Sequence, residues 1–161
     1  MKIIYSVILL SAIAVFAKQP KKLPPAVLKY TISDVFQFVL TAKKQQLNQN
    51  IPFPQIYYKS KTPLKQFQDA IEKQWGQRPN EITNAFADSN NEIYLLDDAD
   101  YYIKSERCMD DSLAHELTHY IQSKYQKFDM NDESLEWDAV DIQTQFREKY
   151  CPTTAPQSYL K

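Results

Sequence analysis

The stretch that most constrains this chain is Ser112–Ile121, which holds both histidines of the 161-residue sequence. His115 and His119 are four residues apart, so on a helix their side chains lie about 40° apart around the axis and can reach one cation. Glu116 falls on the same half of the helix. Imidazole nitrogens suit Zn²⁺, and a glutamate placed there can take a proton from a water on the metal. The pattern predicts a zinc-bearing helix, and the alternative is two histidines that only pack or hydrogen-bond.

The N-terminal residues 1–17 have the pattern of a secretory signal peptide. Lys2 precedes the apolar run Ile3–Phe16, and small residues end at Ala17, where we expect cleavage. The run is too short for a secure membrane span. We therefore expect a secreted or periplasmic protein with no membrane span in its mature form.

Charge is divided unevenly along the mature chain. Residues 18–80 carry 11 Lys and Arg against 3 Asp and Glu, whereas residues 81–161 carry 7 against 17. This is not the uniformly basic composition of a nucleic-acid-binding protein, so we expect no nucleic-acid partner. Either the two halves attract each other when folded, or they form two differently charged solvated faces.

The single glycine, Gly76, excludes a glycine-rich phosphate loop.

A mature chain of about 144 residues is long enough for one domain with a hydrophobic core. Residues 18–31 are rich in lysine and proline, which predicts an extended linker or, alternatively, a basic tether. The domain is expected over 32–151, and residues 152–161 are expected to form a surface tail.

The apolar spacing within this domain predicts a mixture of helices and strands, and hence a small α+β fold. Helices are predicted over 33–48, 63–75 and 132–149, with another beginning near Met109. A turn into a strand is predicted over 51–59, a hairpin from 82–88 and 92–96, and a polar loop over 97–107.

Side chains that can accept a hydrogen bond from the backbone mark where these helices should begin. Thr31 or Ser33 can cap the first helix, Asp110 or Asp111 the histidine helix, and Asn131 or Asp132 the last helix. Gly76 lies where the second helix would end in a left-handed residue. On the histidine helix, the apolar residues Leu113, Leu117, Tyr120 and Ile121 should face away from the two imidazoles.

Cys108 and Cys151 are the only cysteines. In an exported chain an even pair favours a disulfide over two buried thiols. The histidine helix and the last helix are joined by a short connection and should run antiparallel, which brings the start of one beside the end of the other. The disulfide and the helix pair therefore support each other.

A zinc site on the two histidines needs a third ligand, and the last helix offers carboxylates. Glu136 is favoured because it lies off the apolar stripe and is followed by the small Ala139, which leaves room for close approach. Glu133, at the start of the helix, is better explained as a solvated charge. Asp138 is a further alternative.

Three features share an order and spacing with a known family. They are His115-Glu116-Leu117-Thr118-His119, the later Glu136-Trp137-Asp138-Ala139, and the upstream Asn84-Ala85-Phe86-Ala87 with Glu92-Ile93-Tyr94-Leu95. Together they resemble the gluzincin metallopeptidases and their compact members, the minigluzincins. The resemblance covers about residues 82–143 and implies a zincin-like fold. It also implies that Asn84, Ala85, Phe86 and Ala87 bind an extended peptide by strand addition; the alternative is an ordinary hairpin without an exposed edge.

Two positions depart from the family pattern. Many gluzincins have an acidic residue four positions after the ligand glutamate to orient a histidine, and here that position is Val140. Asp138 or Asp141 can substitute for it. No third histidine is available to stabilise an oxyanion, so the resemblance implies a tyrosine, and the sequence does not indicate which one.

The sequence thus predicts a monomeric secreted peptidase with one zinc ion per chain, acting on a peptide or protein substrate. His115, His119 and Glu136 would bind the metal, and Glu116 would act as the general base. One alternative is a catalytically inactive, zinc-stabilised binding module. Another is a disulfide-stabilised interaction domain without a metal.

Overall fold

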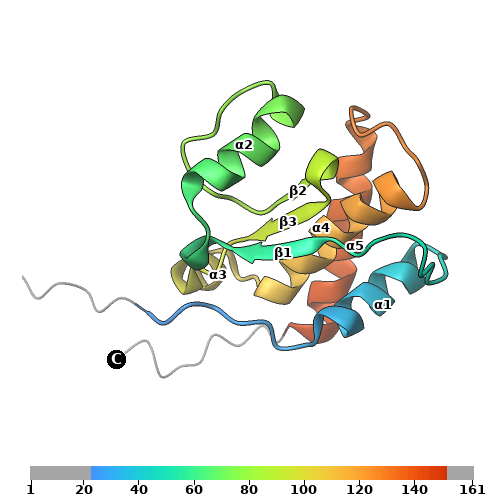
Figure 1. Ribbon diagram of the computed structural model, residues 1–161. Helices are drawn as coiled ribbons and strands as arrows, with labels where there is room; N and C mark the ends of the chain where they lie inside the picture. Colours follow the sequence, from blue (N-terminus) through green and yellow to red (C-terminus); the bar gives the residue numbers. More distant parts are fainter. Residues whose placement is uncertain (1–22, 152–161) are drawn as a thin grey trace, which may run out of the picture.

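A three-stranded sheet with strand order β1–β3–β2 lies at the centre of the molecule (Figure 1). The computed structural model describes residues 23–151, which form one α+β domain with five α-helices. β1 (Gln55–Tyr58) runs parallel to β3 (Glu92–Leu95), and β2 (Ala85–Ala87) pairs antiparallel with β3. The predicted hairpin is therefore confirmed, and β2 is an edge strand.

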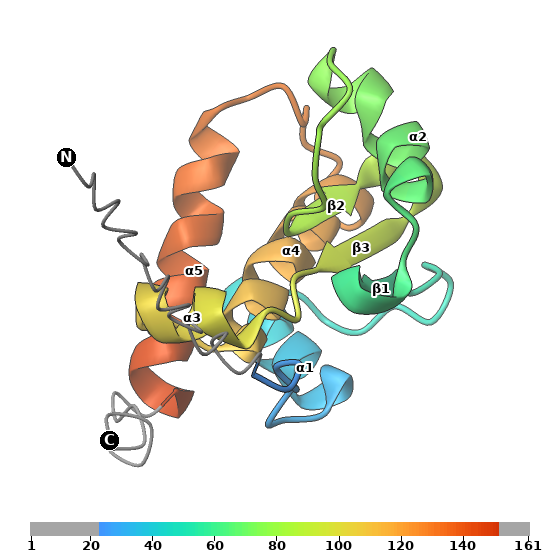
Figure 2. The same cartoon turned by 90° about the vertical axis from the view of Figure 1, so that its left-hand side faces the viewer.

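Helices cover both faces of this sheet (Figures 1 and 2). The helices are α1 (Ile32–Ala42), α2 (Leu64–Trp75), α3 (Ala99–Ser105), α4 (Met109–Lys124) and α5 (Ser134–Tyr150), with short 3₁₀ turns at Lys59–Lys61 and Asp88–Asn90. α2 packs on one face, and α1, α4 and α5 form the layer on the other. The domain thus has three layers, with the sheet in the middle.

Alternation along the strands explains why both faces are covered, since successive side chains point to opposite sides. Phe86, Ile93 and Leu95 are buried in the core shared with α1, α4 and α5. Ala87 and Tyr94 are buried against α2. Each strand therefore contributes to two cores.

α4 and α5 form the antiparallel pair that the sequence predicts (Figure 2). A disulfide joins Cys108, before α4, to Cys151, after α5, with 6.0 Å between the Cα atoms. The four apolar residues predicted to face away from the histidines, Leu113, Leu117, Tyr120 and Ile121, are fully buried. No helix in the described part of the chain is long and apolar enough to cross a membrane.

Two element predictions are wrong. The first helix ends at Ala42 rather than residue 48, because Lys44 adopts a left-handed conformation (φ 53°) and the chain turns away. The predicted polar loop over 97–107 contains helix α3, which begins at an Asp98 cap and buries Tyr102. The sequence did not predict α3 because the segment is mostly polar and has no apolar stripe. One buried aromatic side chain, Tyr102, provides most of its packing.

The caps also differ from the prediction at α4 and at α5, where the N-cap is Glu133 without a side-chain hydrogen bond and Asp132 accepts from the N–H of Ser134. Thr31 caps α1, and Gly76 ends α2 in a left-handed conformation, both as predicted. At α4, however, the N-cap is Cys108, whose Sγ accepts from the N–H of Asp111, while the Asp111 carboxylate accepts from the N–H of Cys108. Asp111 is thus the third residue of the capping arrangement and not the cap itself.

The segment 23–31 belongs to the predicted extended linker, but backbone hydrogen bonds hold it against the domain. The buried carboxylate of Asp110 accepts the backbone N–H groups of Lys29 and Tyr30 at 2.8–3.0 Å. Ala26 donates its N–H to the carbonyl of Asp97. The predicted signal peptide, the start of the linker and the C-terminal tail lie outside the described residues.

Candidate metal centre

α4 and α5 bring three potential metal ligands to one point. Nε2 of His115 and Nε2 of His119 are 3.1 Å apart. The two carboxylate oxygens of Glu136 lie 3.4 Å from Nε2 of His115 and 3.2 Å from Nε2 of His119. Glu133 precedes α5 as an exposed residue and is not part of this group.

The spacing of these atoms fits a tetrahedral zinc ion. Four ligands at about 2.0–2.1 Å from a zinc ion are about 3.3 Å from one another, because that is the edge of the tetrahedron. The separations of 3.1–3.4 Å, taken to the nearer Glu136 oxygen for each histidine, are close to that edge. Two imidazole nitrogens and one carboxylate also match the ligand types of zinc sites that keep one position open.

Glu116 lies beside this group in a buried position, with 4% of its surface exposed. Burial raises the pKa of its carboxyl, and the neighbouring His115 and His119 and the backbone N–H of Phe86 partly oppose this rise. Glu136 is more exposed, and hydrogen bonds from His115 and His119 hold its pKa well below its ordinary value. The two glutamates next to the histidines thus differ in environment and in affinity for protons.

A chain of hydrogen bonds orients His119. Its Nδ1 lies 2.9 Å from Oε1 of the buried Gln122, and Nε2 of Gln122 donates to Asp138 at 2.6 Å and to the carbonyl of Leu135 at 3.0 Å. Because Gln122 donates twice from Nε2, its Oε1 is the atom that accepts from His119. Burial opposes protonation of His119, but Glu136, Glu116 and Gln122 together raise its pKa.

Asp138 therefore reaches a histidine through Gln122, in line with its predicted supporting position. Asp141 does not. Its carboxylate accepts from Gln145 on the exposed face of α5, because five residues along a helix from Glu136 place it on a different side.

His115 has no comparable support. Its Nδ1 is buried and has no hydrogen-bond partner among residues 23–151. Val140 lines the same hollow as His115. It stands four residues after Glu136, where the resemblance to gluzincins leads one to expect an acidic residue. Val140 has no polar atom that could accept a hydrogen bond from a histidine.

The outer edge of β2 is partly occupied by the side chain of Gln74 from α2. Nε2 of Gln74 donates to the carbonyl of Phe86 at 3.0 Å, and its Oε1 accepts from the N–H of Asp88 at 3.0 Å. Alternate residues direct their backbone groups to the same edge, so Ala85 and Ala87 direct theirs toward β3. The expected backbone contact from Ala85 is therefore wrong, because the backbone groups on the outer edge belong to Phe86, and Gln74 already binds its carbonyl.

Asn84 is also used within the fold. Its Oδ1 accepts from the N–H of Leu96 at 2.7 Å and so closes the sheet beyond β2 and β3. This contact accounts for a structural role of Asn84. The residue still lines the hollows beside His115.

Two hollows meet at His115, Glu116 and Glu136 and form one cleft with two arms. The Trp75 arm, about 320 Å³, is further lined by Gln74, Trp75, Asn84, Ala85, Phe86, His119 and Met130. The Arg107 arm, about 200 Å³, is further lined by Thr83, Asn84, Tyr101, Arg107, Ser112, Val140 and Gln143. The candidate metal centre therefore borders both arms.

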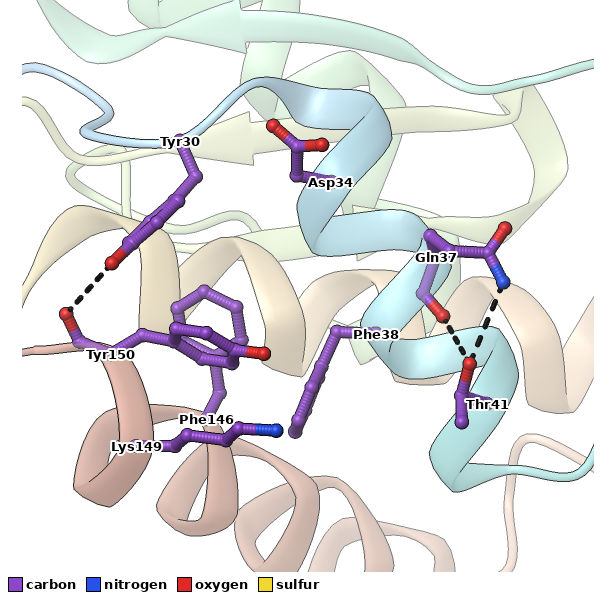
Figure 3. Close-up of a pocket in the computed structure, with 8 residues that line it drawn as sticks. All are labelled: Tyr30, Asp34, Gln37, Phe38, Thr41, Phe146, Lys149 and Tyr150. Atoms are coloured by element: carbon purple, nitrogen blue, oxygen red, sulfur yellow. Dashed lines mark hydrogen bonds between the residues drawn. The ribbon is translucent and has the colours of Figure 1, made fainter.

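A separate hollow of about 440 Å³ lies between α1 and α5 (Figure 3). It is lined by Tyr30, Asp34, Gln37, Phe38, Thr41, Phe146, Lys149 and Tyr150. Phe38 and Phe146 pack edge to face there, with ring centroids 5.1 Å apart. None of the candidate ligands contributes to it, so it is distinct from the cleft.

Sequence reasoning missed Gln122, Gln74, Tyr101 and Arg107 as residues of the site. Gln122 could have been found, because it follows His119 by three residues and shares its helix face. Gln74 comes from a distant segment, and Arg107, although it directly precedes Cys108, belongs to no periodic pattern. Comparisons with protein-family models, curated proteins and solved structures found no match for this chain.

Proposed function

We propose that this protein is an exported, zinc-dependent peptidase of gluzincin type with a zincin-like fold. The observation that carries the proposal is the group of two histidine nitrogens and one carboxylate, 3.1–3.4 Å apart, beside a buried glutamate in a cleft. The disulfide between Cys108 and Cys151 supports an oxidising compartment.

His115, His119 and Glu136 would hold the zinc ion, one per chain. When bound, zinc supplies a Lewis acid that polarises a carbonyl and makes water more acidic. Glu116 takes the proton from the attacking water and later gives it to the leaving amine nitrogen. Gln122 holds Nδ1 of His119, which leaves Nε2 free to act as a ligand.

The edge strand β2 supports a peptide as the substrate. An extended peptide can bind an edge strand through backbone hydrogen bonds, and the backbone of Phe86 faces that edge. Tyr101 lines the same hollow as Glu116 and is the candidate to stabilise an oxyanion.

One observation favours the alternative, an inactive zinc-stabilised binding module. Gln74 occupies hydrogen-bonding groups of Phe86 and Asp88 on the edge that a substrate peptide needs. In an active enzyme this side chain must give way to the peptide. In a binding module it can remain in place.

The test is to measure zinc content and peptide hydrolysis in the purified protein and its variants. We expect one zinc per chain in the wild type and in Glu116→Gln, with hydrolysis lost in E116Q by at least about a thousandfold. Glu136→Gln should lose zinc, whereas the matched Glu133→Gln should keep both zinc and activity. Zinc without any hydrolysis in the wild type would favour the binding module, and absence of zinc would refute both proposals.

A further inference from the structure

The backbone at Arg107 is held in place between two helices. Its N–H donates to the carbonyl of Tyr102 at 3.0 Å, at the end of α3. The next residue, Cys108, caps α4 and is tied to α5 by the disulfide. The backbone of Arg107 is therefore fixed at the wall of the cleft, and its side chain extends from there.

The charge of Arg107 is not neutralised by an ion pair with any side chain of residues 23–151. Asp111, an acid close to it in the chain, is fully buried and already accepts from Cys108 N–H and from Gln143 Nε2 at 2.9 Å. The guanidinium thus remains available to a group that enters the cleft.

The remaining walls of the Arg107 arm suit an anion. Apart from the two glutamates at the metal centre, its polar side chains are the hydroxyl and amide groups of Thr83, Asn84, Tyr101, Ser112 and Gln143. Glu116 and Glu136 lie at the end of the arm where the proposed zinc ion would offset their charge. Because Ser112 and Gln143 donate to Asp111, an incoming carboxylate would meet Arg107 and the neutral side chains of Thr83, Asn84 and Tyr101.

We propose that the Arg107 arm is a specificity site that binds a carboxylate of the substrate peptide. The planar guanidinium matches a carboxylate with two parallel hydrogen bonds, which a lysine cannot reproduce. The carboxylate comes either from an acidic side chain near the scissile bond or from the C-terminus of the peptide. This inference rests on the proposed peptidase function, and it defines the substrate class as peptides with an anionic group near the cleavage site.

Paired alanine-based peptides distinguish the two sources. One pair carries Glu or Gln at each position in turn, and the other has a free or an amidated C-terminus. Zinc-loaded wild-type protein should hydrolyse the member with the carboxylate about tenfold to a hundredfold more efficiently, in kcat/KM. A preference in the first pair assigns a side-chain carboxylate, and a preference in the second assigns the C-terminus.

Variants test whether Arg107 causes this preference. Arg107→Gln should abolish it and Arg107→Lys should restore only part of it. Lys104→Gln removes the same charge from the exposed face of α3, outside the arm, and should leave the preference unchanged. If wild type and R107Q prefer the carboxylate-bearing peptide equally, the inference is overturned. It is also overturned if K104Q loses the preference as R107Q does, because the effect would then come from the long-range electrostatic field of the protein.

Binding to E116Q separates this inference from the proposed function. The same peptides should bind zinc-loaded E116Q about tenfold or more tightly when they carry the carboxylate, and R107Q should remove that difference. Hydrolysis by the wild type without any carboxylate preference refutes the specificity site and leaves the peptidase. Binding that depends on Arg107, with no hydrolysis by the wild type, refutes the peptidase and supports the site.

Discussion

Nδ1 of His119 lies 2.9 Å from Oε1 of Gln122, whereas Nδ1 of His115, one helical turn earlier, has no partner among residues 23–151. The two candidate zinc ligands are therefore supported unequally. Hydrogen bonding at the second nitrogen fixes the ring and raises its basicity as a ligand. The unsupported histidine is thus the weaker part of the candidate centre.

Val140→Asp should supply the missing acceptor. Val140 lines the same hollow as His115, and a carboxylate there can accept from Nδ1. We expect zinc affinity to rise about tenfold to a hundredfold, measured by competition with a chelator. Val140→Ala serves as the control for lost packing, and zinc binding by V140D no tighter than by V140A contradicts the prediction.

Gln74→Ala should open the outer edge of β2. The Gln74 amide forms two hydrogen bonds there, at 3.0 Å each, that a bound peptide must replace. Removal of this competitor should lower KM for long peptides by about fivefold, the equivalent of one net hydrogen bond, and should leave KM for dipeptides unchanged. The measurement is the ratio of the two KM values.

Gln68→Ala provides the matched control for this experiment. Gln68 lies on the same helix, and its Nε2 donates to the carbonyl of Pro79 at 2.9 Å, away from β2. It should lower stability without changing the KM ratio. An equal change in both variants would mean that α2 acts through its packing and not by competing with the peptide.

Asp110→Ala should release the segment 23–31 from α4. The carboxylate accepts from two backbone N–H groups, and its loss leaves both without their acceptor. We expect the free energy of unfolding to fall by about 2–4 kcal/mol, measured with urea, and trypsin to cleave faster after Lys29. Asp110→Asn keeps an acceptor and should lose less.

The control for this prediction is Asp100→Ala, which removes an exposed acid from the first turn of α3. Both acids lie at helix N-termini, so the control accounts for the helix dipole. If D100A and D110A destabilise the protein equally, the contacts to Lys29 and Tyr30 contribute nothing.

A pH-dependent contribution to stability is expected at Asp88. Burial raises the pKa of Asp88, but hydrogen bonds from Lys124 and Ser123 outweigh this effect and leave it below the ordinary value. Since the unfolded chain then binds the proton more readily, the stabilisation is present above about pH 4 and is lost as the pH falls through the lowered pKa.

Asp88→Asn measures this contribution. Because the pair with Lys124, at 2.8 Å, is about one-third exposed, we expect a loss below about 1 kcal/mol near pH 7 and a smaller loss as the pH falls toward 2. Asp141→Asn, on the exposed face of α5, is the matched control. A loss in D88N that is the same at both pH values contradicts an origin in charge.

Periodic and local patterns in the sequence were sufficient for most elements. The stripes of α2, α4 and α5, the β2–β3 hairpin and the left-handed Gly76 all depend on neighbours within a few residues. α3 was missed because its buried face is little more than Tyr102. The Asp110 carboxylate, interpreted as a cap, instead binds a segment eighty residues away, which local reasoning does not detect.

The sequence by itself determined that His115 and His119 share one helix face with Glu116, because a spacing of four residues requires it. It also favoured Glu136, which lies off the apolar stripe three residues before the small Ala139, and the cysteine pair, since two antiparallel helices place their ends together. Only the tertiary structure decided that His119 is supported through Gln122 while His115 is not. It alone placed Gln74 on the edge of β2 and Arg107 in the cleft, because these contacts join segments that have no periodic relationship in the chain.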